Sequence, residues 1–490
     1  MERVITDGSQ ARPKSVAALR APVTGLTSYT WRLIALTAIA LGSRVILLGS
    51  VPRFWGDEAF NGVQLRKPVG AMLDVVRHDS HPPLLYVLER IVGVASTSPA
   101  ALRLVSALAG TAAVLVAAAL GRRIGGDRGG LLAAAVLAGF PTYLQSSRDA
   151  RGYSLAMALI LAAALMLWRA IERPTRGRLL AYGVCAAAAL YTHYFAAPAI
   201  GSQLLVALAV FRPARRTAII LVGVCGAAGL SLVPWLFAAI AQFRHVGSPF
   251  WVATIHVSSL VTDTSRGLSQ TPGQELTAVG VWLAEATVIP LLVVAYRRAS
   301  NSSRRGMLYL LGCALAPTLA LLLLSLWKPV YDARFIAMFW GPGEAVVGAS
   351  LVVLRWRVVP VAICLALAGA SLISLLQIHR PDFNAVVSPL NGRVHDGDIV
   401  ALNGPDHYFS LAYAGDAATN RALRVVADSV PWYFGTAGYP PGTEVRSIPD
   451  TPGRLYIVGD ATQRPPALPA GFRQVQRACH DAICVDSYSR

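Results

Sequence analysis

Long apolar segments separated by short polar connections dominate roughly the first 380 of the 490 residues. The segments run for roughly 17–22 residues, the length with which an α-helix crosses about 30 Å of hydrocarbon. They predict transmembrane helices at 31–51, 101–120, 129–146, 152–171, 179–193, 196–211, 217–236, 276–296, 306–327, 335–354 and 358–376. The pattern therefore indicates an all-α polytopic membrane protein with about 11 transmembrane helices.

The pattern changes after residue 377, where polar, Gly- and Pro-rich sequence is broken by short β-branched runs. The runs DIVAL (398–402) and RLYIVG (454–459) are typical of buried strands, and 406–414 is typical of a helix. About 110 residues suffice for one small domain. We expect a cytoplasmic tail at 1–30, a transmembrane domain at 31–376 with an external loop at 52–90, and an α/β domain at 377–490.

Composition and charge support the membrane assignment and indicate its orientation. Hydrophobic residues make up 54% of the chain, charged residues only 14%, and mean hydropathy is +0.51. The net charge of +18 comes mostly from arginine, in clusters between apolar segments rather than along one stripe, so we expect anionic lipid headgroups and no nucleic acid as partners. Every second connection is Arg-rich, and the five together carry 16 arginines: GRRIGGDR, RAIERPTRGR, FRPARR, RRASNSSRR and RWR. The positive-inside rule places these in the cytoplasm and the C-terminal domain outside.

The connections predicted to be external contain acids, histidines and tyrosines. They also contain four basic residues on the side where basic residues are disfavoured: Arg148, Arg151, Lys328 and Arg334. Their charge could be offset by an anionic ligand or by salt bridges to Asp149 and Asp332. The charge pattern alone favours neither explanation.

The first external connection contains the acid pair of FWGDEAF (54–60), Asp57 and Glu58. Apolar residues then recur with helical spacing over 69–76, which predicts a short helix lying in the membrane interface. In HDSHPPLLY (78–86) the double proline forces His81 out of helical conformation and can begin the next helix. Asp57 is either a reactive group or a helix N-cap, and His81 is either functional or a structural histidine.

These residue types fit one kind of chemistry at an external membrane face. A carboxylate can accept the proton of an attacking hydroxyl, and basic side chains can stabilise charge on a phosphate leaving group. Glycosyl transfer from a polyprenyl-phosphate sugar needs this inventory and no nucleotide site. The alternatives are a transporter or flippase, for which two similar halves are expected and no convincing repeat is found, or a non-catalytic scaffold.

Five motifs in order resemble bacterial family 39 glycosyltransferases: FWGDEAF, HPPLLY, SSRDARGYSLAM, YTHYF and VYDARFIAM…GPG. This family is related to protein O-mannosyltransferases and the lipid A aminoarabinose transferase, within the GT-C superfamily. The resemblance covers about residues 30–355. It implies an inverting transferase of the inner or plasma membrane, with its active site facing the extracytoplasmic side. The donor would be a polyprenyl-phosphate sugar, carrying a hexose or a pentose, and the acceptor a lipid, glycan or protein of the cell envelope.

The resemblance also implies roles for individual residues. Asp57 matches the catalytic base, and Glu58 its companion, which orients Asp57 or holds a metal ion. His81 stands where several relatives carry a lysine that contacts the lipid phosphate. The remaining donor-phosphate candidates are Arg151, Arg334, Lys328 and Arg148, and the candidates for substrate or metal contact are His193 and Tyr153, the latter alternatively an interfacial anchor. The resemblance leaves a divalent metal ion open, with Glu58 and His193 as candidate ligands.

Two further features concern the external side. Cys479 and Cys484, in CHDAIC, predict a disulfide that closes a short loop. The stretch 237–275, with Trp251 and His256, is either a plain loop or a lid over the site. Arg44, inside the first apolar segment, is expected to face the helical bundle or to snorkel.

Overall fold

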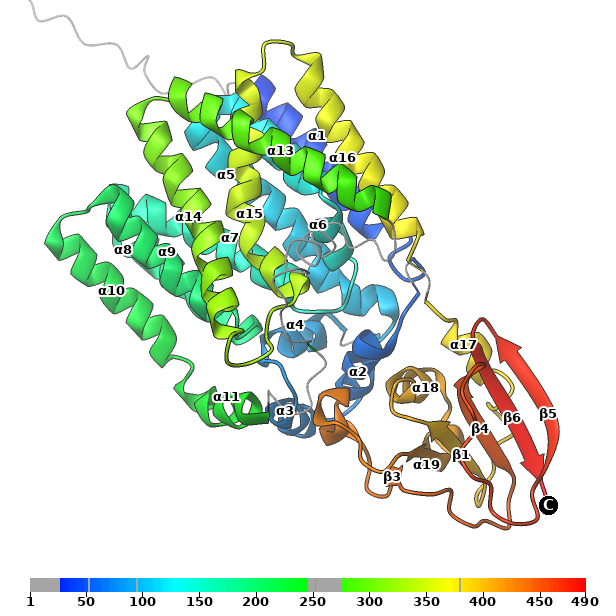
Figure 1. The fold of residues 1–490 in the computed structure, drawn as a ribbon. Helices are drawn as coiled ribbons and strands as arrows, with labels where there is room; N and C mark the ends of the chain where they lie inside the picture. Colours follow the sequence, from blue (N-terminus) through cyan, green and yellow to red (C-terminus); the bar gives the residue numbers. More distant parts are fainter. Residues whose placement is uncertain (1–26, 52, 94–95, 246–251, 253–274, 379) are drawn as a thin grey trace, which may run out of the picture.

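The structure, a computed structural model, describes residues 27–51, 53–93, 96–245, 252, 275–378 and 380–490. Helices form the larger part of the molecule, and a smaller α/β unit lies at one end of them (Figure 1). The elements of the helical part are α1 (Ser28–Val45), α2 (Gly56–Leu65), α3 (Val69–His78), α4 (Leu84–Val92), α5 (Pro99–Gly139), α6 (Pro141–Ser146), α7 (Tyr153–Glu172), α8 (Arg176–Thr192), α9 (Ala196–Phe211), α10 (Arg215–Leu230), α11 (Val233–His245), α13 (Glu275–Arg298), α14 (Asn301–Leu324), α15 (Ala333–Ser350), the 3-10 helix η2 (Leu351–Val353) and α16 (Val358–Leu376). Helix thus occupies each of the eleven ranges expected to span the membrane.

Two of the expected segments form a tight hairpin within α5. The helix breaks at Gly125 and Gly126, and Gly126 adopts the left-handed φ of 64° that glycine tolerates. The two arms approach closely because small residues face each other; a Cβ on Gly121 would lie 2.4 Å from that of Ala133. Close contact through small residues is a typical way of packing helices in membranes.

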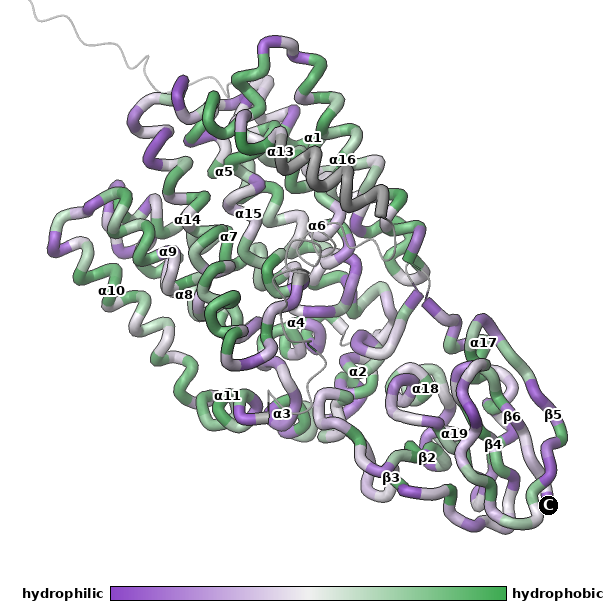
Figure 2. The backbone as a smooth tube through the Cα atoms, in the orientation of Figure 1, coloured by the Kyte–Doolittle hydropathy of each residue, from purple (hydrophilic) through white to green (hydrophobic). Residues whose placement is uncertain are grey.

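The chain is a multi-pass membrane protein. Among the described residues, five helices are long and apolar enough to cross a membrane (α5, α7, α14, α15 extended through η2, and α16), and the bent pair of α10 and α11 makes a sixth. These helices consist mainly of hydrophobic residues, and hydrophilic residues are concentrated in the connections (Figure 2). The total of about eleven crossings stays a prediction.

The Arg-rich connections gather at the end of the helical part that lies away from the α/β unit (Figure 1). Arg123 pairs with Glu172 at 2.6 Å, Ser303 donates to the carbonyl of Ile124, and Arg298 donates to that of Val353. These contacts join three of the five connections and attach one of them to η2, which lies just before a fourth. This grouping is the arrangement that the positive-inside rule requires, and the cytoplasmic location of this end remains a prediction.

The short helices α2, α3 and α4 lie at the opposite end. Helix α3 covers the amphipathic segment, as predicted, and its apolar residues Met72 and Val76 are buried inside the protein. Helix α4 begins directly after Pro83, in agreement with the expected helix start. Arg44 faces the bundle, fully buried, and donates to the carbonyl of Ala40.

The C-terminal unit contains one six-stranded sheet, in the order β3-β2-β1-β4-β6-β5. The strands β3, β2, β1 and β4 are parallel, and β6 and β5 are antiparallel. Its elements are α17 (Phe383–Val387), β1 (Ile399–Asn403), α18 (Tyr408–Ala414), α19 (Ala417–Ala422), β2 (Leu423–Val426), η3 (Trp432–Phe434), η4 (Thr436–Gly438), β3 (Glu444–Val445), β4 (Leu455–Asp460), β5 (Arg473–His480) and β6 (Ile483–Ser489). The predicted strands correspond to β1 and β4, whose apolar runs are buried, as central parallel strands require, and the predicted helix corresponds to α18.

The disulfide between Cys479 and Cys484 is present and closes the β5–β6 hairpin, so this prediction is confirmed. The C-terminal unit also contacts the short helix α2 and the segment before it directly. Helix α18 packs against α2, with the rings of Phe60 and Phe409 4.8 Å apart. Arg53 pairs with Asp481 at 2.9 Å. Most of the expected tail lies outside the described residues. Of the stretch 237–275, residues 237–245 belong to helix α11 rather than to a loop, and most of the remainder, with Trp251 and His256, also lies outside the described residues.

Candidate active site

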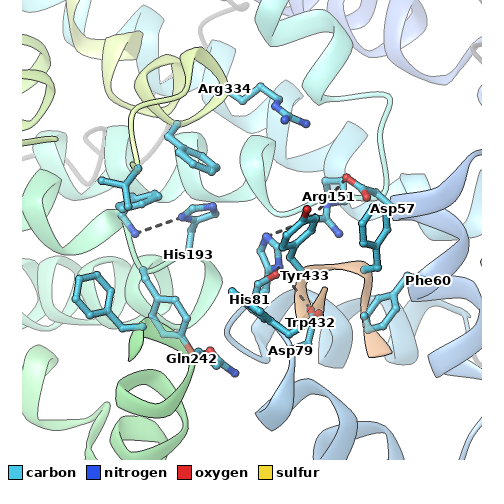
Figure 3. A pocket seen from close by; sticks show the side chains of 18 of the residues that line it. Asp57, Phe60, Asp79, His81, Arg151, His193, Gln242, Arg334, Trp432 and Tyr433 are labelled. Carbon is cyan, nitrogen blue, oxygen red and sulfur yellow. Dashed lines mark hydrogen bonds and ion pairs between the residues drawn. The ribbon is translucent and has the colours of Figure 1, made fainter. Parts of the chain in front are cut away.

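A cavity of about 780 Å³ lies where the short helices at this end, the bundle and the C-terminal unit meet (Figure 3). Its wall is built from segments that are far apart in the sequence: 55–60, 79–81, 151–153, 190–197, 232–244, 330–335, 405–409 and 432–435. Six of the nine predicted site residues line it: Asp57, His81, Arg151, Tyr153, His193 and Arg334. The other three, Glu58, Arg148 and Lys328, do not line it.

Asp57 lies in the first turn of α2, where the helix dipole favours an acidic side chain. The N-cap of α2 is Trp55, so Asp57 does not cap this helix. Its carboxylate is 44% exposed and lies 3.9 Å from the guanidinium of Arg151. Asp57 is therefore an accessible acid that borders the cavity and has a cation beside it.

Arg151 contacts both Asp57 and His81, the histidine that precedes the double proline. Its Nη2 lies 3.2 Å from Nε2 of His81. Because arginine only donates hydrogen bonds, Nε2 of His81 is the acceptor, and the ring proton belongs on Nδ1, which lies 2.7 Å from Oγ of Ser80. Burial is the largest single influence and acts against the charge of Arg151, but Asp57, Tyr153, Tyr86 and Asp79 together outweigh it and raise the pKa of Arg151.

His81 is consequently a neutral group that positions Arg151. Burial, and next the neighbouring Arg151, lower the pKa of His81 below its ordinary value. This geometry does not fit the expectation that His81 binds phosphate as a lysine would, because that role needs a cation. His81 instead accepts a hydrogen bond from the guanidinium of Arg151 and so helps to position it.

His193 and Tyr153 form the next part of the wall. The rings of His81 and His193 are 5.7 Å apart, and those of Tyr153 and His193 are also 5.7 Å apart. Nδ1 of His193 accepts from the amide of Phe195, which leaves the proton on Nε2, a buried atom without a hydrogen-bond partner in the described part of the chain. Burial lowers the pKa of His193 well below its ordinary value. Tyr153 is buried in the cavity wall, which does not fit an interfacial anchor.

Arg334 and Lys328 lie at the bundle side of the cavity. Asp332 caps α15 by accepting from the amide of Arg334, and it also pairs with the guanidinium at 3.1 Å. Arg334 nevertheless reaches the cavity wall (Figure 3). The ammonium of Lys328 lies 5.1 Å from the ring centre of Phe243, a wall residue, so Lys328 is at the margin of the cavity.

The carboxylate of Glu58 points away from the cavity into a buried ion-pair network. Arg103 of α5 donates to both of its oxygens at 2.6 Å, and Arg380 donates at 3.0 Å. The backbone amide of Ala150 donates at 2.8 Å. A direct catalytic role for Glu58 does not fit this geometry, because neither carboxylate oxygen faces the cavity. Glu58 instead fixes α2 to α5, to the loop that carries Arg151, and to the start of the C-terminal unit.

Arg148 is likewise held elsewhere. Its guanidinium donates to the backbone carbonyls of Ser43, Arg44, Ile46 and Val51, at the end of α1. With its donors used in this way, Arg148 does not fit the expected role in phosphate binding. Asp149, the acid that charge patterning offered as its partner, pairs with Arg380 at 3.0 Å instead.

The candidate metal ligands do not fit a shared ion. Glu58 is enclosed by two guanidiniums, which would repel a divalent cation, and His193 lies at the cavity wall while Glu58 does not. Within the described residues there is no cluster of three or more His, Cys, Asp or Glu side chains with suitable geometry.

Several wall residues were not identified from the sequence. Asp79 lies beside His81, with its carboxylate 3.6 Å from the ring, and could have been inferred from HDSHPP. Gln242 of α11 donates to the carbonyls of Val76 and Arg77 and so attaches α11 to α3. Trp432 and Tyr433, from the C-terminal unit, extend to the cavity (Figure 3). They follow β2 by several residues, and no local pattern connects them with Asp57.

The two sides of the cavity differ in chemistry. The side formed by the bundle and α11 is apolar, with Leu190, Phe195, Leu232, Ala239, Ile240, Phe243, Val330 and Phe335. Ile240 and Phe243 of α11, which belong to this side, are 41% and 46% exposed. The side near α2 and the C-terminal unit carries carboxylates and aromatic rings. Arg151 and Arg334 also belong to the wall.

Comparison with known proteins agrees with the resemblance inferred from the motifs. Residues 80–238 match the family model described as dolichyl-phosphate-mannose-protein mannosyltransferase. No curated protein matches the sequence. ArnT from Cupriavidus metallidurans, in a crystal structure with undecaprenyl phosphate bound, is 12% identical, with a TM-score of 0.63 over 94% of this chain and 98% of ArnT. An oligosaccharyltransferase from Archaeoglobus fulgidus, in complex with Zn and sulfate, is 14% identical, with a TM-score of 0.54 over 88% of this chain and 68% of its own. The chain therefore has the fold of ArnT and of the archaeal oligosaccharyltransferase.

Proposed function

We propose that the protein is an inverting glycosyltransferase that moves a sugar from a polyprenyl-phosphate donor to a cell-envelope acceptor on the extracytoplasmic side of the membrane. The observation that carries the proposal is the placement of Asp57 and Arg151 within 3.9 Å of each other, in a cavity that also includes Arg334 and has one apolar side. The structural similarity to ArnT, whose crystal structure holds undecaprenyl phosphate, supports a lipid phosphate as the donor class.

The chemistry follows from the positions of these groups. The acceptor hydroxyl attacks the anomeric carbon while the bond between that carbon and the phosphate oxygen breaks. Asp57 accepts the hydroxyl proton, and Arg151 and Arg334 stabilise the negative charge on the departing polyprenyl phosphate. The prenyl chain lies along the apolar side, towards Ile240 and Phe243, where it avoids contact with water.

Release of polyprenyl phosphate by purified protein in lipid nanodiscs, with a cell-envelope extract as the source of the acceptor hydroxyl, tests the proposal. The donors are polyprenyl-phosphate hexoses and pentoses, and the variant is Asp57→Asn. We expect the variant to lose about 10²–10⁴-fold of the rate, the range of general base catalysis. Asp74→Asn is the matched control, because Asp74 is exposed on α3 and does not line the cavity. Equal release by the wild type and Asp57→Asn would show that Asp57 is not the base.

A transporter or flippase is the rival function. It would move labelled lipid across proteoliposomes at a rate that Asp57→Asn does not change, without producing free polyprenyl phosphate. That combination of results would reject the glycosyltransferase.

A further inference from the structure

The C-terminal unit turns the carboxyl ends of two adjacent parallel strands towards the cavity. β1 ends at Asn403, and Pro405, Asp406 and Phe409 follow it in the wall. β2, its parallel neighbour, ends at Val426, and the segment 432–435 follows it in the wall. In α/β sheets, ligands bind outside the carboxyl ends of the parallel strands, at the point where the strand order reverses, which here lies between β1 and β4. The binding edge of this sheet is therefore part of the cavity.

Packing fixes the aromatic segment 432–435 against the helix that carries Asp57. Gly435 has a φ of 71°, and a Cβ there would lie 2.7 Å from the ring of Phe60 and 3.0 Å from that of Phe409. Only glycine allows this approach together with this backbone conformation. Phe60 is one helical turn after Asp57 on α2, so this packing fixes the position of the aromatic segment relative to the acid.

The loop after β1 is fixed in a similar way. His407 lies 3.1 Å from Asp460, the last residue of β4, so the carboxyl end of a third parallel strand holds this loop. A Cβ on Gly56 would lie 3.7 Å from the carbonyl oxygen of Asp406, which places the loop against the start of α2. Asp406 itself is exposed in the wall.

The chemistry of this side suits a sugar ring. Aromatic rings present a negative face that attracts the weakly positive C–H groups of a pyranose or furanose, and carboxylates accept hydrogen bonds from its hydroxyls. Trp432, Tyr433 and Phe434 supply rings, and Asp406 supplies a carboxylate. A bound peptide commonly extends a sheet at its edge strand, but the edge strands β3 and β5 contribute no residue to the described wall.

We infer that the carboxyl ends of β1 and β2 form the acceptor half of the site, and that the acceptor is a carbohydrate. The inference rests on the proposed function, since it names the acceptor for the reaction at Asp57. The donor occupies the apolar half, and the acceptor sugar stacks on Trp432 with its attacking hydroxyl towards Asp57.

The test is transfer by full-length protein in nanodiscs from a polyprenyl-phosphate sugar that the wild type cleaves. The acceptors are manno-, galacto-, gluco- and arabino-oligosaccharides and, in parallel, peptides rich in Ser and Thr. We expect transfer to an oligosaccharide. Trp432→Ala should raise KM for that oligosaccharide about ten-fold, and raise KM for the donor much less. The control, Trp356→Ala, alters a tryptophan that is 71% exposed, between η2 and α16, and should leave both KM values as in the wild type.

Two further variants guard against misfolding of Trp432→Ala. Trp432→Phe keeps a ring and should recover most of the acceptor affinity, and Asp406→Asn, at an exposed position, should raise KM for the acceptor on its own. Transfer to peptides alone, cleavage without transfer to any oligosaccharide, or equal acceptor KM values for Trp432→Ala and Trp356→Ala would each overturn the inference. Failure of the wild type to cleave any donor would instead reject the proposed function.

Discussion

The adjacent acids Asp57 and Glu58 should respond in opposite ways to the same substitution, since only one of them lies in the cavity wall. Glu58→Gln removes a carboxylate that is 0% exposed and receives Arg103 twice at 2.6 Å, as well as Arg380 at 3.0 Å. Removing one partner of a buried ion pair costs about 3–5 kcal/mol, because the other charge remains buried without compensation. We expect Glu58→Gln to lower the free energy of unfolding by about this amount.

Asp57→Asn should leave stability nearly unchanged and abolish most of the activity. Its carboxylate is 44% exposed and has one cation at 3.9 Å, a contact of the kind worth about 0–1 kcal/mol. Thermal unfolding followed by tryptophan fluorescence in nanodiscs gives the order of stability, and release of polyprenyl phosphate by the same samples gives the rate.

The matched control is Glu172→Gln, which breaks an ion pair with Arg123 of the same 2.6 Å length at the opposite end of the bundle. Its side chains are 46% and 24% exposed, so about 0–1 kcal/mol is expected. A melting temperature of Glu58→Gln equal to that of Glu172→Gln would refute the structural role of Glu58. Wild-type release by Asp57→Asn would refute the catalytic role of Asp57.

Three further outcomes are expected. Arg151→Lys should raise KM for the donor and lower kcat, since a lysine cannot contact both the acid and the imidazole of His81 as the planar guanidinium does; kinetics equal to those of the wild type would contradict this. Burial, and next Arg151, lower the pKa of His81, and burial lowers that of His193 further, so the unfolded chain binds protons that the folded chain does not. Stability should therefore fall as the pH drops below about 6.5 towards the folded pKa values, and His81→Gln should weaken this dependence of the melting temperature. Replacing Cys479 and Cys484 by serine should cost about 2 kcal/mol, from the short loop that they close, and leave donor cleavage intact; loss of cleavage would place the hairpin in the active site.

The sequence alone determined the helices, because each follows from the length and composition of one apolar segment, and both are local properties of the chain. The eleven apolar ranges are helical, and DIVAL and RLYIVG are strands. Short-range motifs likewise identified Asp57, His81, Arg151, Tyr153, His193 and Arg334, all of which line one cavity.

Only the tertiary structure decided what these residues face. Asp57 and Glu58 are neighbours in one helical turn, and their side chains differ by a single methylene. Asp57 nevertheless borders the cavity, whereas Glu58 is enclosed by Arg103 and Arg380. Helical neighbours point about 100° apart, and what each of them meets depends on segments about 45 and 320 residues away. The aromatic residues 432–434 of the wall could not be predicted from the sequence for the same reason. Their contact with α2 depends on how the C-terminal sheet is placed, and it leaves no periodic pattern in the chain.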